Sequence, residues 1–254
     1  MEILNKIAEL ANENRDFAIV TVVKSGGSAP HKAGAKMVID EKGLIAGTIG
    51  GGCLEFDIIQ LAQEQMKKNE ASLFSFNLKK DFKMACGGVS DIFIEPVISA
   101  PTLFIFGAGH VAVALAPLAR QAGFKIVIID DRESFANPAR FPDAKDIIVS
   151  PFEECFDKLP INSRSYLVIM TREHSFDEMV LKKCLSYEYK YLGMMGSSSK
   201  VSVFKNNLIK AGIRKDKFET VYMPIGVKIK SGKPFEVAVS IVCQLIDIKN
   251  SQPV

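Results

Sequence analysis

The sequence predicts an α/β protein, in which a C-terminal domain with a doubly wound parallel sheet follows a smaller N-terminal α+β domain. After residue 102, nearly continuous apolar runs alternate with helix-like segments, which is typical of parallel strands buried on both faces. A glycine pattern directly after the first run matches the turn of a Rossmann-type domain. Before residue 98, shorter strand-like runs lack that alternation. We therefore expect domains at 1–98 and 102–254, joined by small residues and a proline.

The N-terminal domain is expected to begin with a helix over 2–13, where apolar residues recur at helical spacing. Short runs rich in β-branched and aromatic residues predict strands at 17–23, 35–40, 44–49, 71–78 and 89–97. The turn Glu41-Lys42-Gly43 predicts a hairpin between the second and third of these strands. A helix is predicted over 53–68, with Leu54, Ile58, Leu61 and Met66 on its apolar face.

The C-terminal domain is predicted to alternate strands with helices. The strands are expected at 103–107, 125–130, 146–150, 165–171 and 189–195. The helices are expected at 109–122, 175–186, 198–211 and 234–248, with a further short helix after residue 150. Pro234 suits the first turn of the last helix. That helix is strongly apolar, so it either completes the core or pairs two chains, and a homodimer is the expected assembly.

Composition narrows the class of protein. Of 254 residues, 48% are hydrophobic and 24% charged, which indicates an ordinary globular core. A net charge of +3 without a basic run argues against nucleic acid as a partner. No apolar stretch approaches the ~20 residues that cross a bilayer. The acid-containing start lacks signal-peptide features, so a cytoplasmic protein with free thiols is expected.

The clearest chemical motif is the pattern Gly107-x-Gly109-x-x-Ala112 between a strand and a helix. The first glycine permits the tight turn, the second lets a pyrophosphate approach, and the alanine lets helix and strand pack closely. Asp130 ends the next strand, 23 residues after Gly107, where an acid can bind a ribose. We expect NAD rather than NADP, because a carboxylate repels a 2′-phosphate, although the neighbouring Arg132 works against this inference.

The alternatives for this motif are a Rossmann-type domain without a cofactor or one that binds another adenine-containing ligand. The expected cofactor-binding residues are Gly107, Ala108, Gly109, His110, Asp130, Asp131, Gly193, Gly196 and Ser197.

Two glycine–cysteine motifs and one basic loop stand out in the N-terminal domain. Gly50-Gly51-Gly52 precedes Cys53 at a predicted helix start, a position that favours a thiolate. Cys86 precedes Gly87 and Gly88, and the glycine-rich loop 25–37 carries Lys24, His31, Lys32 and Lys36 nearby. Together they suggest an anion pocket with sulfur ligands. The alternatives are buried structural cysteines and a solvated loop.

The sequence lacks the motifs of several common metal-binding, nucleotide-binding and hydrolase sites. The chain has no C-x-x-C for structural zinc, no H-E-x-x-H, no P-loop and no G-x-S-x-G nucleophile elbow. His31, His110 and His174 lie far apart in the sequence, which favours surface or loop positions over a shared metal site.

These motifs, in this order, resemble the XdhC/CoxI family of xanthine dehydrogenase accessory proteins. The matching segments are GSAP (27–30), GAKM (34–37), GTIGGGCLE (47–55), CGG (86–88), FGAGHVA (106–112), YLGMMGSSSKV (191–201) and MPIGVKIKSGKPFEVAVSI (223–241). The resemblance covers the chain from about residue 15 to 245. One departure is His31, which stands where the family often has an arginine and weakens the expectation of a fixed phosphate clamp.

The resemblance implies a molybdenum cofactor-binding chaperone for maturation of a xanthine dehydrogenase-like molybdenum hydroxylase. Its expected partners are the hydroxylase apoenzyme and a cysteine desulfurase-type sulfur donor. The pterin and sulfur of the cofactor would then meet Ser28, Pro30, Gly50, Gly51, Gly52, Cys53, Glu55, Cys86, Gly87 and Gly88. Cys53 and Cys86 are the candidate molybdenum contacts, because thiolates are soft ligands.

Two further functions stay open at this point. An NAD-dependent oxidoreductase acting on a small molecule is the main alternative, although no proton donor lies in a recognisable motif. A nucleotide-sensing regulatory protein without chemistry is the other. The sequence leaves open whether the protein is an enzyme.

Overall fold

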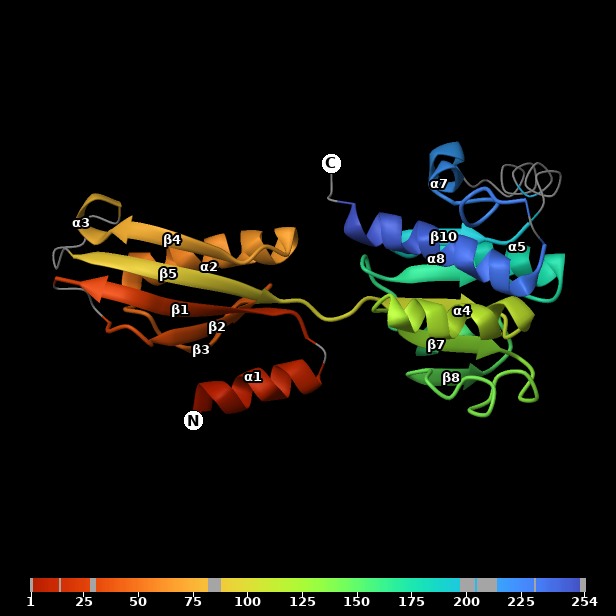
Figure 1. Cartoon of the computed structure of the whole chain (residues 1–254), viewed down its shortest axis with the longest axis horizontal. Helices are drawn as coiled ribbons and strands as arrows, with labels where there is room; N and C mark the ends of the chain where they lie inside the picture. The colour runs from red at the N-terminus through yellow and green to blue at the C-terminus, as the bar shows by residue number, and fades with distance from the viewer. Residues whose placement is uncertain are drawn as a thin grey trace. The chain divides into compact units, whose positions relative to one another are not determined.

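A computed structural model describes residues 2–13, 15–27, 31–81, 88–196, 204, 214–230 and 232–251. The chain divides into two compact units, Met1–Ser99 and Ala100–Val254, each with its own sheet (Figure 1). Within the described residues, no helix is long and apolar enough to cross a membrane.

The first unit is built on an antiparallel sheet in the order β3-β2-β1-β5-β4. Its strands are β1 (Phe17–Gly26), β2 (Lys36–Asp40), β3 (Gly43–Gly47), β4 (Ser72–Asn77) and β5 (Val89–Val97). Its helices are α1 (Glu2–Asn12), α2 (Gly52–Lys68) and the short α3 (Leu78–Asp81). The strands and the two longer helices expected from the sequence are all present.

Alternation along β1 assigns the two longer helices to opposite faces of this sheet. Ala18 and Val20 belong to one buried cluster together with Leu54 of α2. Phe17 lies in another cluster together with Leu10 of α1. Because successive strand residues point to opposite faces, α1 and α2 cover different sides.

The predicted hairpin joins β2 to β3 through Glu41 and Lys42. The Asp40 side chain accepts hydrogen bonds from the backbone N–H groups of Lys42 (2.8 Å) and Gly43 (3.2 Å). Gly43 has a φ of 126°, a conformation that other residues rarely adopt. These hydrogen bonds and the conformation of Gly43 therefore account for the residues found in this turn.

The second unit is a parallel sheet in the order β10-β9-β6-β7-β8. Its strands are β6 (Thr102–Phe106), β7 (Lys125–Asp130), β8 (Asp146–Val149), β9 (Tyr166–Ile169) and β10 (Tyr191–Met194). Its helical segments are α4 (His110–Gln121), η1 (Cys155–Lys158), α5 (His174–Cys184), α7 (Lys215–Glu219) and α8 (Pro234–Asn250). The predicted helix 198–211 falls outside the described residues except for Phe204.

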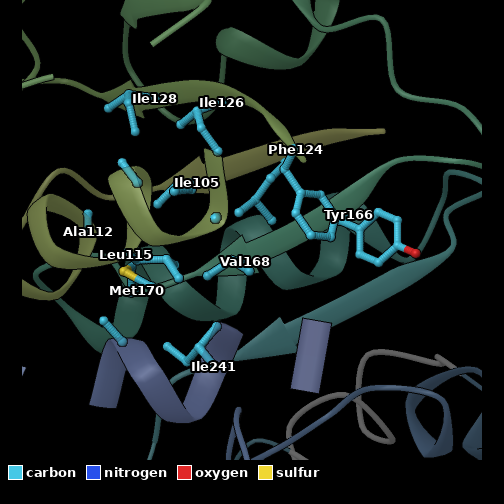
Figure 2. Close-up of a cluster of buried hydrophobic side chains, with 14 of the residues drawn as sticks. Ile105, Ala112, Leu115, Phe124, Ile126, Ile128, Tyr166, Val168, Met170 and Ile241 are labelled. Carbon is cyan, nitrogen blue, oxygen red and sulfur yellow. The ribbon is translucent and has the colours of Figure 1, made fainter. Parts of the chain in front are cut away.

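Two buried clusters lie on the two faces of this sheet. One cluster joins β6, β7 and β9 to α4 and α8, as Ile105, Leu115 and Ile241 illustrate (Figure 2). The other includes Val180 of α5 and Phe156 of the short helix. The predicted doubly wound parallel sheet is therefore confirmed, and α8 contributes to its core.

Strand order reverses between β6 and β9. The chain runs from β6 outward through β7 to β8, then returns to β9 on the other side of β6. Ligands of open α/β sheets bind at such a reversal, outside the carboxyl ends of the strands. The carboxyl edge of this sheet, at β6 and β9, is therefore the expected position of a ligand site.

Candidate functional site

Gly107 forms the tight turn where β6 ends. Its φ is 107°, and a Cβ there would lie 2.7 Å from the carbonyl carbon of Met170, just after β9. Its N–H also donates to the carbonyl oxygen of Ile129 (2.7 Å). Because the Met170 backbone lies this close, only glycine fits at position 107.

Gly109 opens the same loop toward solvent. It is the N-cap of α4, no side chain caps this helix end, and a Cβ would meet no atom within 4 Å. Ala112, by contrast, is fully buried in the core. Helix N-termini attract anions, so the free space at Gly109 suits an approaching phosphate. His110, in the first turn of α4, is exposed.

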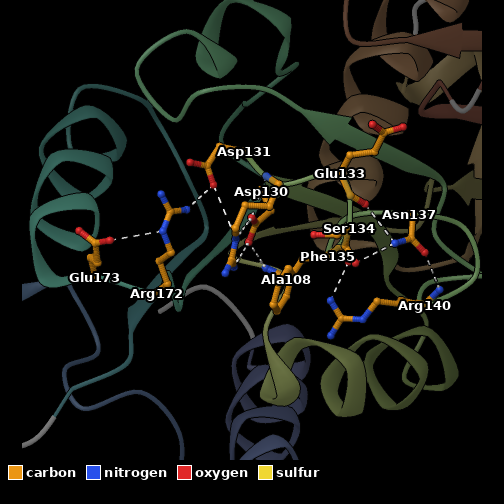
Figure 3. A network of polar contacts seen from close by, with 11 residues as sticks. Ala108, Asp130, Asp131, Glu133, Ser134, Phe135, Asn137, Arg140, Arg172 and Glu173 are labelled. Carbon is orange, nitrogen blue, oxygen red and sulfur yellow. Dashed lines mark hydrogen bonds and ion pairs between the residues drawn. The ribbon is translucent and has the colours of Figure 1, made fainter.

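Asp130 is the fully buried acid at the end of β7 (Figure 3). It accepts hydrogen bonds from Ala108 N (2.8 Å), Arg132 N (3.1 Å), Arg132 Nε (2.8 Å) and Arg132 Nη2 (3.0 Å). Burial alone would raise the pKa of Asp130, but the bonds from Arg132 and Ala108 lower it overall. The carboxylate expected to bind a ribose is therefore engaged by the protein itself.

Two arginines surround the neighbouring Asp131. Arg172 hydrogen-bonds to Asp131, and Arg132 Nε lies 3.8 Å from it. The Arg132 guanidinium stacks 3.8 Å from the ring centre of Phe135. This contact, with the bonds to Asp130, holds the arginine in one orientation. Sequence reasoning noted Arg132 but missed Phe135, whose role depends on packing.

Asp177 links the end of β9 to the first turn of α5. It accepts hydrogen bonds from Thr171 N (3.0 Å) and Thr171 Oγ1 (2.6 Å). Burial raises the pKa of Asp177 despite these bonds. His174 Nδ1 lies 3.8 Å from its other oxygen, and the His174 ring is exposed. Sequence reasoning did not single out this carboxylate.

Gly193 and Gly196 were expected to contact a cofactor. Gly193 is buried in β10, where a Cβ would lie 2.5 Å from the Tyr191 hydroxyl and 2.7 Å from the Ile225 side chain. Close packing therefore accounts for this glycine without a ligand. Gly196 is half-buried, and Ser197 lies outside the described residues.

In the first unit, the Glu55 side chain is hydrogen-bonded to the loop that precedes α2. Its Oε1 accepts hydrogen bonds from Ile49 N and Gly51 N, both at 2.9 Å, and from the Thr48 hydroxyl. Burial alone would raise the pKa of Glu55, but the bonds from Thr48 and the backbone lower it. The backbone N–H groups of Ile49 and Gly51, in the loop where an anion pocket was expected, are therefore already bonded to this carboxylate.

The basic loop and Gly47-Thr48, which precede the glycines 50–52, meet around one hollow. It measures about 430 Å³ and is lined by Ile3, Leu4, His31, Gly34, Ala35, Lys36, Gly47 and Thr48. Thr48 N donates to the carbonyl oxygen of Lys36 (3.1 Å), which joins the two loops directly. The Lys36 ammonium donates to Thr21 Oγ1 (2.7 Å). The hollow therefore joins the basic loop to the start of the GTIGGGCLE segment, which follows it across the β2–β3 hairpin, and Gly50–Cys53 are not among its lining residues.

Cys53 is exposed in the first turn of α2. Gly51 and Gly52 beside it have φ values of 75° and 65°, and a Cβ on either would meet nothing within 4 Å. Gly50 also has a positive φ, of 138°. The conformation explains these glycines, and it also leaves the backbone open to a flat ligand.

Ser28, Pro30, Cys86 and Gly87 lie outside the described residues, and Gly88 has a φ of 97°. Within the described part of the chain, no three histidine, cysteine or acidic side chains cluster as a metal site would require. Of the other cysteines, Cys155 and Cys184 are buried free thiols and Cys243 is an exposed one.

Two family models match the chain in succession. A model described as the XdhC and CoxI family matches residues 10–77, and one described as the XdhC Rossmann domain matches residues 103–245. Each lies within one of the two units. The two matches therefore divide along the chain as its two sheets do.

The chain is also similar to individual proteins. It is 30% identical to protein YqeB of Escherichia coli (strain K12), covering 100% of this chain and 47% of YqeB. It thus spans about half the length of that relative. It is 21% identical to a Bacillus subtilis (strain 168) protein named as a probable xanthine dehydrogenase subunit, covering 94% of this chain and 95% of that protein.

A solved structure shares the fold. A crystal structure of a Bacillus halodurans protein described as a xanthine dehydrogenase superposes with a TM-score of 0.56 and 22% identity. The alignment covers 100% of this chain and 97% of that chain.

Proposed function

The chain belongs to the XdhC and CoxI family, and from that premise we propose that it is an accessory factor for a molybdenum hydroxylase. The motif resemblance is confirmed by the two family matches. The Bacillus subtilis relative, named for xanthine dehydrogenase, links the family to that class of enzyme. In this proposal the protein holds molybdenum cofactor, receives sulfur from a desulfurase-type donor, and passes the cofactor to the apoenzyme. A homodimer is the proposed assembly.

One observation carries the proposal: the hollow in the first unit is linked by a hydrogen bond to the helix turn that carries the exposed Cys53 thiol. His31 and Lys36 line the hollow and suit the phosphate of a pterin cofactor. Thr48 lines it too and hydrogen-bonds to Glu55, in the first turn of α2. That turn also carries Cys53. Thr48 and Glu55 thus link the basic side chains of the hollow to the turn that carries the Cys53 thiol, which does not itself line the hollow. Basic groups and a soft sulfur ligand together suit a phosphorylated, sulfur-bearing molybdenum ligand.

The test compares two exposed cysteines. Cys53→Ser and Cys243→Ser are each purified from cells that make molybdenum cofactor, and the retained pterin is measured by fluorescence after oxidation. We expect Cys53→Ser to lower retention about tenfold, equivalent to about 1.4 kcal/mol of binding free energy. Cys243 is exposed on α8 of the other unit, so Cys243→Ser should match wild type.

The outcomes separate the residue from the function. Equal retention in both variants and wild type would remove Cys53 from the site. Wild-type protein that carries no pterin would contradict the proposed function itself.

We also propose that the second unit binds a nicotinamide dinucleotide. Support comes from the strand reversal, the turn at Gly107 and the open space at Gly109, which fit a pyrophosphate. The dinucleotide would supply redox chemistry, while the loop would hold its phosphates. An NAD-dependent oxidoreductase stays the alternative function, with His174 beside Asp177 as a candidate proton donor at this edge. Oxidation of NADH with a panel of carbonyl compounds would distinguish the two functions.

A further inference from the structure

We propose that Arg132 receives the phosphate on the adenosine ribose of NADP(H), so that this unit prefers NADP(H) to NAD(H). The inference rests on the proposed binding of a dinucleotide at the Gly107 loop. It reverses the preference that the acid at the end of β7 suggests on sequence grounds.

The first step concerns what Asp130 can no longer do. In NAD-binding domains, the acid at this position accepts hydrogen bonds from the ribose hydroxyls. Here both oxygens of Asp130 already accept bonds from Ala108 and Arg132, and the side chain is buried. A ribose could reach this carboxylate only by displacing the arginine. The carboxylate that usually recognises the ribose of NAD is therefore already hydrogen-bonded within the protein.

The second step concerns charge. A lone carboxylate would repel a ribose phosphate, but the charge of Asp130 is balanced by a two-pronged ion pair with Arg132. The Arg132 side chain is 29% exposed, whereas that of Asp130 is 1% exposed. A ligand at the end of β7 therefore meets the arginine rather than the acid.

The third step concerns the donors that Arg132 has left. A guanidinium carries five N–H groups, and Asp130 takes two of them, at Nε and Nη2. The remaining N–H groups can serve phosphate oxygens. Stacking on Phe135 fixes the plane of the group, so little side-chain entropy remains to be lost on binding.

Asp131 limits the size of the preference. Its carboxylate is partly exposed beside Arg132 and opposes a second negative group. Its ion pair with Arg172 offsets part of that charge. We therefore expect NADP to bind about tenfold tighter than NAD, the effect of one charge-assisted hydrogen bond.

The test uses the full chain and isothermal titration with NADP⁺ and NAD⁺, and with 2′,5′-ADP and 5′-AMP as fragments. We expect Arg132→Gln to reduce the NADP⁺/NAD⁺ preference to about one and to change NAD⁺ affinity less than about threefold. Arg132→Lys should retain part of the preference, because it keeps the charge without the planar fork. Arg140→Gln is the matched control, since Arg140 also stacks on Phe135 but donates to its carbonyl oxygen.

Each outcome supports or overturns the inference. NAD⁺ binding as tightly as NADP⁺, or a preference that survives Arg132→Gln, would overturn it while leaving dinucleotide binding intact. If Arg132→Gln weakens both ligands equally, Arg132 only supports the fold, and the inference fails. If neither dinucleotide binds wild type, the proposed dinucleotide site fails and takes the inference with it.

Discussion

Gly107 and Gly109 stand two residues apart and meet different physical demands. Gly107 has a left-handed φ and backbone atoms of the chain after β9 directly against it. Gly109 has an ordinary φ of −73° and open space where a side chain would begin. The first glycine is therefore required by the fold, and the second is available to a ligand.

Alanine at these two positions should separate stability from binding. Gly107→Ala should lower the free energy of unfolding by about 1–3 kcal/mol, because of strain and a backbone clash. Gly109→Ala should change it by less than about 0.5 kcal/mol but should weaken dinucleotide binding, since the added Cβ fills the approach. Urea unfolding and titration measure the two effects. A stability loss at Gly109→Ala equal to that at Gly107→Ala would contradict this division.

Two helices begin with a carboxylate that holds the preceding loop. Glu55 serves α2 and bonds the loop amides of Ile49 and Gly51. Asp177 serves α5 and bonds Thr171. Their pKa values move in opposite directions, because hydrogen bonds prevail at Glu55 and burial prevails at Asp177. The same local design therefore produces opposite dependences on pH.

The amide variants should reveal these signs. Glu55 has a folded pKa below its usual 4.5, so its contribution is present above pH 4.5 and is lost as pH falls through the folded pKa. Glu55→Gln should thus be less stable than wild type near neutral pH, with the difference shrinking in acid. Asp177 has a raised pKa, so stability falls as pH rises from 3.8 through the folded pKa. The stability of Asp177→Asn relative to wild type should therefore improve with rising pH. Thermal unfolding of wild type and both variants between pH 3 and 7 measures these differences. Differences from wild type that do not change with pH would contradict the two pKa directions.

Elements with strong local signals were predictable from sequence. The strand predicted at 125–130 is observed as Lys125–Asp130, because a run of apolar residues ends there at an acid. The strand predicted at 165–171 is shorter, Tyr166–Ile169, because Thr171 turns away to bond Asp177. Side-chain partnerships were harder to foresee. Asp130 was predicted at the sheet edge, but its capture by Arg132 depends on packing against Phe135.

At the scale of the whole molecule, the chain consists of two units with separate cores. The buried clusters of the first unit involve residues up to Val97, and those of the second begin at Leu103. The two family matches, 10–77 and 103–245, also fall on either side of this boundary. Each unit therefore has what an independently folding domain requires.

A fragment of residues 100–254 should fold alone and keep the dinucleotide affinity of the full chain within about threefold, because every residue proposed for that ligand lies inside it. Circular dichroism and titration measure this, with fragment 1–99 as the control that should fold without binding dinucleotide. A folded 100–254 fragment that had lost the ligand would show that the first unit supplies part of the site.

The contacts of the Asp130 carboxylate decide which residue should be changed to test the proposed cofactor preference. It accepts hydrogen bonds from the backbone N–H of Ala108, in the Gly107 loop, and from the Arg132 side chain. The same carboxylate therefore holds both the loop and the arginine in place. A substitution of the acid would therefore also disturb the Gly107 loop, where the phosphates of the proposed dinucleotide would bind. The proposed preference is therefore best altered by changing residue 132 and leaving residue 130 unchanged.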